Sequence, residues 1–176
     1  NRLTAGEEVT FTGQHFELNS VRIQPKSPQA EGVPLLVACH WGSGLDRQFE
    51  RAARLGDGYI SISDSPQEFA LVTDRVRYHA ERAGKRFESM EAAFYMTINL
   101  DEDESRATDE ADRYLRLYYG MNIWGDRWDP YGDSGRVVDR IRQYVEAGAG
   151  TIIVRFASFD QQRQLESFLS KVAPAL

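Results

Sequence analysis

Apolar and polar residues alternate in two different patterns along the chain. Four short runs are almost entirely apolar, which is typical of parallel strands buried on both faces; they cover residues 33–39, 59–62, 92–100 and 151–156. Around these runs, apolar residues recur every three or four positions, which predicts amphipathic helices. The resulting order, βαβαβααβα, favours parallel βαβ units. It fits either a small open α/β sheet or half of an eight-stranded barrel.

Capping residues predict where the helices begin. A hydroxyl or carboxylate before the first turn accepts hydrogen bonds from free backbone N–H groups, and acidic residues are stabilised at that end of the helix dipole. The predicted starts are Ser43, with Asp46 three positions on; Ser65, in a capping box with Pro66 and Glu68; the acidic run 101–104; and Ser158, with Gln161.

Three segments lie outside this repeating pattern. The opening stretch "VTFTGQHFEL" reads as two short strands around Gly13, which predicts a small hairpin. A proline-containing linker follows, up to Pro34. The stretch 119–135, "YGMNIWGDRWDPYGDSG", is too irregular for a helix and too aromatic for a plain linker. We interpret it as a functional loop.

Composition narrows the class of protein. A chain of 176 residues suits one domain over 1–176, and its net charge of −6 argues against a nucleic-acid surface. The one cysteine, Cys39, excludes an intramolecular disulfide, and no apolar run is long enough to span a membrane. We therefore expect a cytoplasmic protein with no membrane and no nucleic-acid partner.

Motifs for metal binding and hydrolysis are missing. The three histidines, His15, His40 and His79, do not have the spacing of metal ligands, so no metal is expected. The sequence contains no G-x-S-x-G elbow, no Walker loop and no H-E-x-x-H helix.

The segment "ACHWGSG" lies where the first buried strand meets a helix. Backbone N–H groups at such a junction favour a phosphate, and Ala38, Gly42, Ser43 and Gly44 are small enough for close approach. A tight turn with a capped helix explains the same residues equally well. Cys39 also fits a small buried hydrophobe, and His40 fits either a phosphate donor or an ordinary loop residue.

Three places near the ends of later strands are candidates for substrate contact. Asn99 and Arg155 lie at the carboxyl ends of their strands, where barrel enzymes carry function. An ion pair with an acidic neighbour is the alternative for Arg155. In the long loop, Trp124 and Trp128 could cover a flat ring or an aliphatic substrate, or else form a small cluster that holds the loop in place.

Several stretches, taken in order, resemble the carboxyl-terminal half of the luciferase-like monooxygenase family. They are "VTFTGQHFEL", "VPLLVAC", "RAARLGDGYI", "YVEAGAGTIIV" and "LESFLSKVAPAL". The resemblance implies βα units of a TIM barrel and an oxidoreductase that uses F420 or FMN with a small-molecule substrate. The region "ARLGDGYI" favours F420 slightly.

The resemblance also implies which loops hold the phosphate of the cofactor. Carried over by position, these are Ala38, Cys39 and His40 after the first strand, and Asp57 and Gly58 at the second. Ser43 joins this set as the expected helix cap. The family often has glycine where this chain has Cys39.

About four of the eight barrel strands are represented. A half barrel has two unpaired sheet edges, so we expect a homo-oligomer or pairing with a missing amino-terminal half. The alternative is a non-catalytic α/β assembly module with a vestigial phosphate loop.

Overall fold

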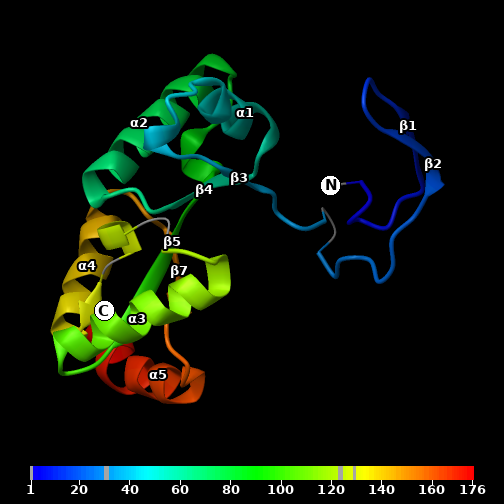
Figure 1. Cartoon of the computed structure of the whole chain (residues 1–176). Coiled ribbons are helices and arrows are strands. Elements are labelled where there is room, and N and C mark those ends of the chain that lie inside the picture. Colours follow the sequence, from blue (N-terminus) through cyan, green and yellow to red (C-terminus); the bar gives the residue numbers. More distant parts are fainter. Residues whose placement is uncertain (1, 30–31, 123–124, 129) are drawn as a thin grey trace.

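The computed structural model describes residues 2–29, 32–122, 125–128 and 130–176. An antiparallel hairpin of β1 (Val9–Thr12) and β2 (Glu17–Val21) stands to one side of a larger α/β body (Figure 1). At its turn, the Gly13 N–H donates to the Phe16 carbonyl at 2.9 Å. The predicted hairpin is confirmed.

The body is built on a parallel sheet whose four longer strands follow chain order (Figure 1). Its strands are β3 (Leu36–Ala38), β4 (Gly58–Ile62), β5 (Glu91–Leu100) and β7 (Thr151–Phe156), and the short β6 (Tyr131–Gly132) pairs with the last two residues of β5. The prediction of parallel βαβ units is confirmed. β3 is shorter than predicted: residues 33–35 lie outside the ladder, and Pro34 has no N–H to contribute.

One face of the sheet packs against helices. The helices are α1 (Arg47–Leu55), α2 (Pro66–Arg82), α3 (Glu104–Tyr119), α4 (Ser134–Glu146) and α5 (Gln161–Ser167), the last continuing into a π-helical segment (Phe168–Val172). The core lies between the sheet and α1, α2 and α4, and it centres on Phe94, whose ring stacks on Tyr144 at 3.7 Å. Within the described ranges, no helix is both long and apolar enough to cross a membrane.

The other face of the sheet carries side chains that alternate with those of the core. Leu36, Ile60 and Tyr95 on this face are half-buried, and Ile153 is exposed. α3 lies across the carboxyl end of the sheet, where its buried alanines and Leu115 contact Ile62. Strands in chain order, with the core helices on one face, are the arrangement of barrel βα units.

Two predicted helix starts are confirmed and two are wrong. The Ser65 hydroxyl accepts from the Glu68 N–H at 3.2 Å in a complete capping box, and α3 starts in the acidic run. Ser43, however, lies in a separate 3-10 turn (Trp41–Ser43), four residues before α1. The last helix is capped by Asp160 rather than Ser158, because the Asp160 carboxylate accepts from the Arg163 N–H.

Candidate functional site

The loop after β3 lies at the carboxyl edge of the sheet, as predicted, but its residues divide between two environments. Ala38 is exposed on the open face of the sheet. Cys39 is fully buried among core residues, and burial raises the pKa of its thiol to about 12. The Cys39 side chain therefore packs in the core with its thiol protonated, and it is not available to a ligand.

Most backbone donors of this loop are already used inside the protein. The N–H groups of Cys39, His40, Trp41, Ser43 and Gly44 donate to Ile60 O, Gln48 Oε1, Asp64 Oδ2, His40 O and Trp41 O respectively. Across residues 39–44, only the Gly42 N–H has no partner among the described residues. The loop thus offers an anion fewer backbone donors than the sequence predicts.

The space beside the loop is open on one side. A Cβ placed on Gly42 or Gly44 would meet no atom within 4 Å, so a ligand could approach the backbone closely there. The Ser43 hydroxyl donates to His40 O at 3.0 Å and accepts from Leu45 N. Ser43 therefore holds the turn together instead of capping a helix.

A buried carboxylate that sequence reasoning missed lies directly behind the loop. Asp64 is 2% exposed, and its Oδ2 accepts from Ser61 Oγ at 2.5 Å and Trp41 N at 3.2 Å. The same oxygen lies 3.9 Å from His40 Nδ1. The Tyr144 hydroxyl donates to the Asp64 carbonyl at 2.7 Å and so ties this position to α4. The sequence feature that could have indicated Asp64 is its position as an acidic residue just after the buried strand β4.

Asp57 and Gly58 do not join this site. They begin β4, where Gly58 pairs with Leu36, whereas the loop follows the other end of β3. At about 3.3 Å per strand residue, the two places lie at opposite edges of the sheet. Asp57 Oδ2 accepts from Leu35 N at 2.7 Å, and a Cβ on Gly58 would strike the Glu91 carbonyl. Asp57 and Gly58 therefore serve the close packing of neighbouring strands at this edge.

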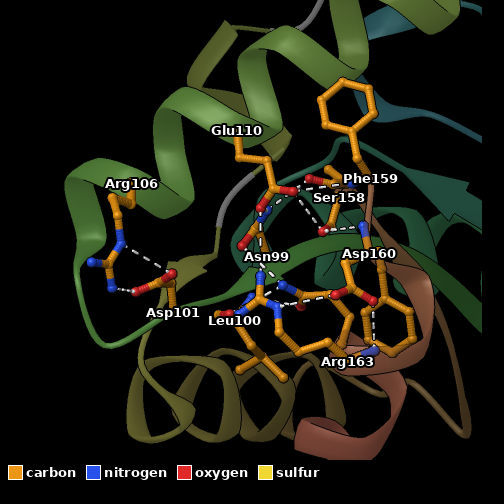
Figure 2. A network of polar contacts seen from close by, with 12 residues as sticks. Asn99, Leu100, Asp101, Arg106, Glu110, Ser158, Phe159, Asp160 and Arg163 are labelled. Atoms are coloured by element: carbon orange, nitrogen blue, oxygen red, sulfur yellow. Dashed lines mark hydrogen bonds and ion pairs between the residues drawn. The ribbon is translucent and has the colours of Figure 1, made fainter.

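Asn99 belongs to a buried polar network between β5, α3 and the segment after β7 (Figure 2). Its amide nitrogen donates to Glu110 Oε2 at 2.9 Å and to Ala157 O, while its oxygen accepts from Gln164. Ser158 Oγ donates to Glu110 at 2.8 Å. Asn99 is fully buried, and these contacts within the protein join β5 to α3 and to the segment after β7. Its contact with a substrate stays a prediction.

Arg155 contacts aromatic residues on the open face of the sheet. Its guanidinium donates to Tyr119 Oη at 2.6 Å and to Thr97 Oγ1 at 2.8 Å, and it lies 5.4 Å from the Tyr95 ring centroid. These contacts join β7, β5 and the end of α3.

The long loop is only partly described. Trp124 lies outside the described residues, and Trp128 ends a short 3-10 turn (Gly125–Trp128). Arg127 in this turn donates to Glu68 at 2.9 Å and to Ser63 O at 3.3 Å. The loop is therefore attached to the start of α2, close to Asp64. In the part of the chain that is described, no three His, Cys, Asp or Glu residues are grouped to hold a metal.

Relatives were found among proteins of known activity. F420-dependent glucose-6-phosphate dehydrogenase of Nakamurella multipartita is 24% identical over the whole chain, and that of Kribbella flavida is 31% identical over 71% of it. The chain spans about 57% of the length of the Nakamurella protein.

Solved structures share the fold. An F420-dependent secondary alcohol dehydrogenase in complex with an F420-acetone adduct matches 99% of the chain with a TM-score of 0.76 and 18% identity, and 58% of that protein is covered. The F420-dependent tetrahydromethanopterin reductase of Methanopyrus kandleri matches 98% with a TM-score of 0.72 and 16% identity, covering 59% of that protein. The predicted barrel-type βα units are confirmed by these likenesses.

A family model described as luciferase-like monooxygenase matches residues 1–130. This match covers well over half of the chain and agrees with the resemblance seen in the sequence. The chain belongs to the luciferase-like monooxygenase family.

Proposed function

We propose that these 176 residues form the carboxyl-terminal half of a barrel domain in an oxidoreductase that uses F420 or FMN. Family membership supports the reaction class, and the F420-dependent relatives favour F420. The bound cofactor supplies the redox chemistry, while the protein binds it, orients it and excludes water. The substrate is a small molecule, and a cytoplasmic location fits the one reduced, buried cysteine.

The observation that carries the proposal is the open loop at the carboxyl edge of the sheet. Among the described residues the Gly42 N–H has no acceptor, a Cβ on Gly42 would meet no atom within 4 Å, and the half-buried His40 adds a second donor. Ala38 has no bulky side chain on the open face next to them. These residues fit a phosphate at the outer surface of the loop, although the donors differ from those predicted from the sequence.

We further propose that the sheet edges are closed by another polypeptide, either a companion amino-terminal half or a second copy. β3 and β7 each have a strand partner on only one side among the described residues. Beside β7 lies a groove of about 500 Å³ with a largely apolar lining. It is formed by Ile141, Val145, Ile152, Val154, Phe168 and Leu176, together with Arg142 and Glu146. Unpaired edges next to apolar grooves are typical of assembly surfaces.

Titration of the 176-residue chain with F420 and with FMN tests the proposal, with the visible spectrum and the oligomeric state as readouts. We expect saturable binding of at least one cofactor. A stable oligomer that binds neither cofactor nor phosphate would favour the second candidate, an assembly module whose loop is vestigial. The internally bonded donors of the loop and the apolar groove are the observations that favour this candidate.

A further inference from the structure

We propose that Asp64 is a positioning residue for His40, so that the cofactor phosphate is bound mainly by an imidazole held from behind by a buried carboxylate. This inference rests on the proposed function. It adds the His40 imidazole as the group that binds the phosphate where the N–H groups of the loop are already bonded within the protein.

The geometry begins with the carboxylate. Asp64 is 2% exposed and is fixed by hydrogen bonds from Ser61 Oγ and Trp41 N, while its carbonyl is held by Tyr144. Three separate segments (β4, the loop after β3 and α4) therefore fix the position of Asp64. A carboxylate fixed in this way can orient a neighbouring ring.

The ring it faces is that of His40. Nδ1 is the ring nitrogen paired with Asp64, at 3.9 Å, and the His40 side chain is 34% exposed. The His40 backbone is also immobilised, because its N–H donates to Gln48 Oε1 and its carbonyl accepts from Gln48 Nε2 at 2.8 Å. Nε2 is left as the nitrogen that can meet a ligand.

Charge favours the same arrangement. A phosphate needs donors or a cation, and in this loop the free backbone donor is the Gly42 N–H alone among the described residues. A charged imidazole is attracted both to the Asp64 carboxylate, whose Oδ2 lies 3.9 Å from Nδ1, and to a phosphate on the side of Nε2. Arg51 of α1 acts on the neighbouring Cys39, and Arg127 donates to Ser63 O and to Glu68 beside Asp64, so cationic groups surround this corner.

The test compares FMN with riboflavin, which differs from it by the phosphate, and includes F420. Calorimetric titrations use the parent chain, His40→Gln, Asp64→Asn and the double variant, each checked for folding by circular dichroism. Asp64→Asn keeps an oxygen for Trp41 N and Ser61 Oγ but removes the charge. Ser61→Ala, which frees the carboxylate, is a second route if Asp64→Asn does not fold.

We expect His40→Gln to weaken FMN or F420 binding about tenfold and leave riboflavin unchanged, since a charge-assisted hydrogen bond is lost. Asp64→Asn or Ser61→Ala should give a smaller loss that disappears in the His40→Gln background.

Equal losses for Asp64→Asn with and without His40, or equal losses on riboflavin, would show that Asp64 only supports the fold. A parent chain that binds FMN with no preference over riboflavin overturns this inference while the proposed function stands. A parent chain that binds no cofactor overturns both.

Discussion

The Asn99 amide nitrogen donates to Glu110 Oε2 at 2.9 Å and thereby joins the end of β5 to α3 (Figure 2). Glu110 also accepts from Ser158 Oγ and from the Phe159 N–H, so a single carboxylate holds three segments at the carboxyl edge of the sheet. α3 lies across this edge, and the network therefore determines how the edge is covered.

The first prediction concerns acid stability. Burial acts to raise the pKa of Glu110, but hydrogen bonds from Asn99, Ser158 and Phe159 and the charge of Arg163 hold it below its ordinary value of 4.5. A carboxyl whose pKa is lower in the folded state stabilises the fold above its unfolded pKa, and this contribution is lost as the pH falls through the folded value. We expect stability from this group to be complete above about pH 5 and to decline below pH 4.5.

Glu110→Gln tests this expectation. It should cost about 1–3 kcal/mol of unfolding free energy at pH 7 and flatten the decline in acid, measured by urea unfolding at several pH values. Glu102→Gln is the control, because Glu102 makes an exposed ion pair with Lys171, and such pairs contribute about 0–1 kcal/mol. An equal effect of both variants would contradict the network role of Glu110.

The second prediction separates ligand approach from stability at the loop glycines. Gly42→Ala places a methyl group in open space, so we expect no loss of stability but weaker binding of F420 or FMN, because the cofactor can no longer approach the backbone. Gly150→Ala is the control, since its new methyl group would have only ordinary contacts and Gly150 precedes β7 at the other edge. Unchanged affinity in Gly42→Ala would place the phosphate elsewhere.

The third prediction uses the left-handed backbone of Gly44. Its φ of 65° is unfavourable for an alanine, so Gly44→Ala should cost about 1 kcal/mol even though its methyl group meets no neighbour. Thermal unfolding beside Gly42→Ala measures this difference directly. Equal melting temperatures would show that the turn relaxes freely.

The fourth prediction concerns the thiol of Cys39. Burial raises its pKa to about 12, so the native protein should not react with a thiolate-specific reagent at pH 8 and should react fully after unfolding. Cys39→Gly should lower stability by about 1–3 kcal/mol through lost burial and added chain freedom, with no gain in cofactor affinity. Rapid labelling of the folded chain would contradict this.

The fifth prediction tests the placement of Asp57. Asp57→Ala removes the hydrogen bond to Leu35 N and should destabilise the start of β4 by about 1–2 kcal/mol. Cofactor affinity should be unchanged because Asp57 lies at the edge opposite the loop. Weaker binding at constant stability, measured by titration and urea unfolding, would return Asp57 to the phosphate site.

Local patterns in the sequence determined much of the fold. β7 was predicted with its observed ends, and the Ser65 capping box follows from four adjacent residues. Both depend on interactions between residues close in the chain, namely strand propensity and side-chain hydrogen bonds to the next turn. The same rule, that a serine before an apolar repeat caps the helix, failed at Ser43 and Ser158. The Ser43 hydroxyl accepts from Gln48, and the Ser158 hydroxyl donates to Glu110, which lies on another helix.

The sequence by itself therefore determined the order of strands and helices, the parallel sheet and the family resemblance. Only the tertiary structure decided which strand-end residues meet. Asp64 reaches Trp41 across 23 positions and Asn99 reaches Gln164 across 65, and no periodicity encodes such distances. The tertiary structure also decided which N–H groups of the loop after β3 have no acceptor. A backbone N–H donates to an acceptor that folding brings within about 3 Å of it, and such acceptors come from distant parts of the chain.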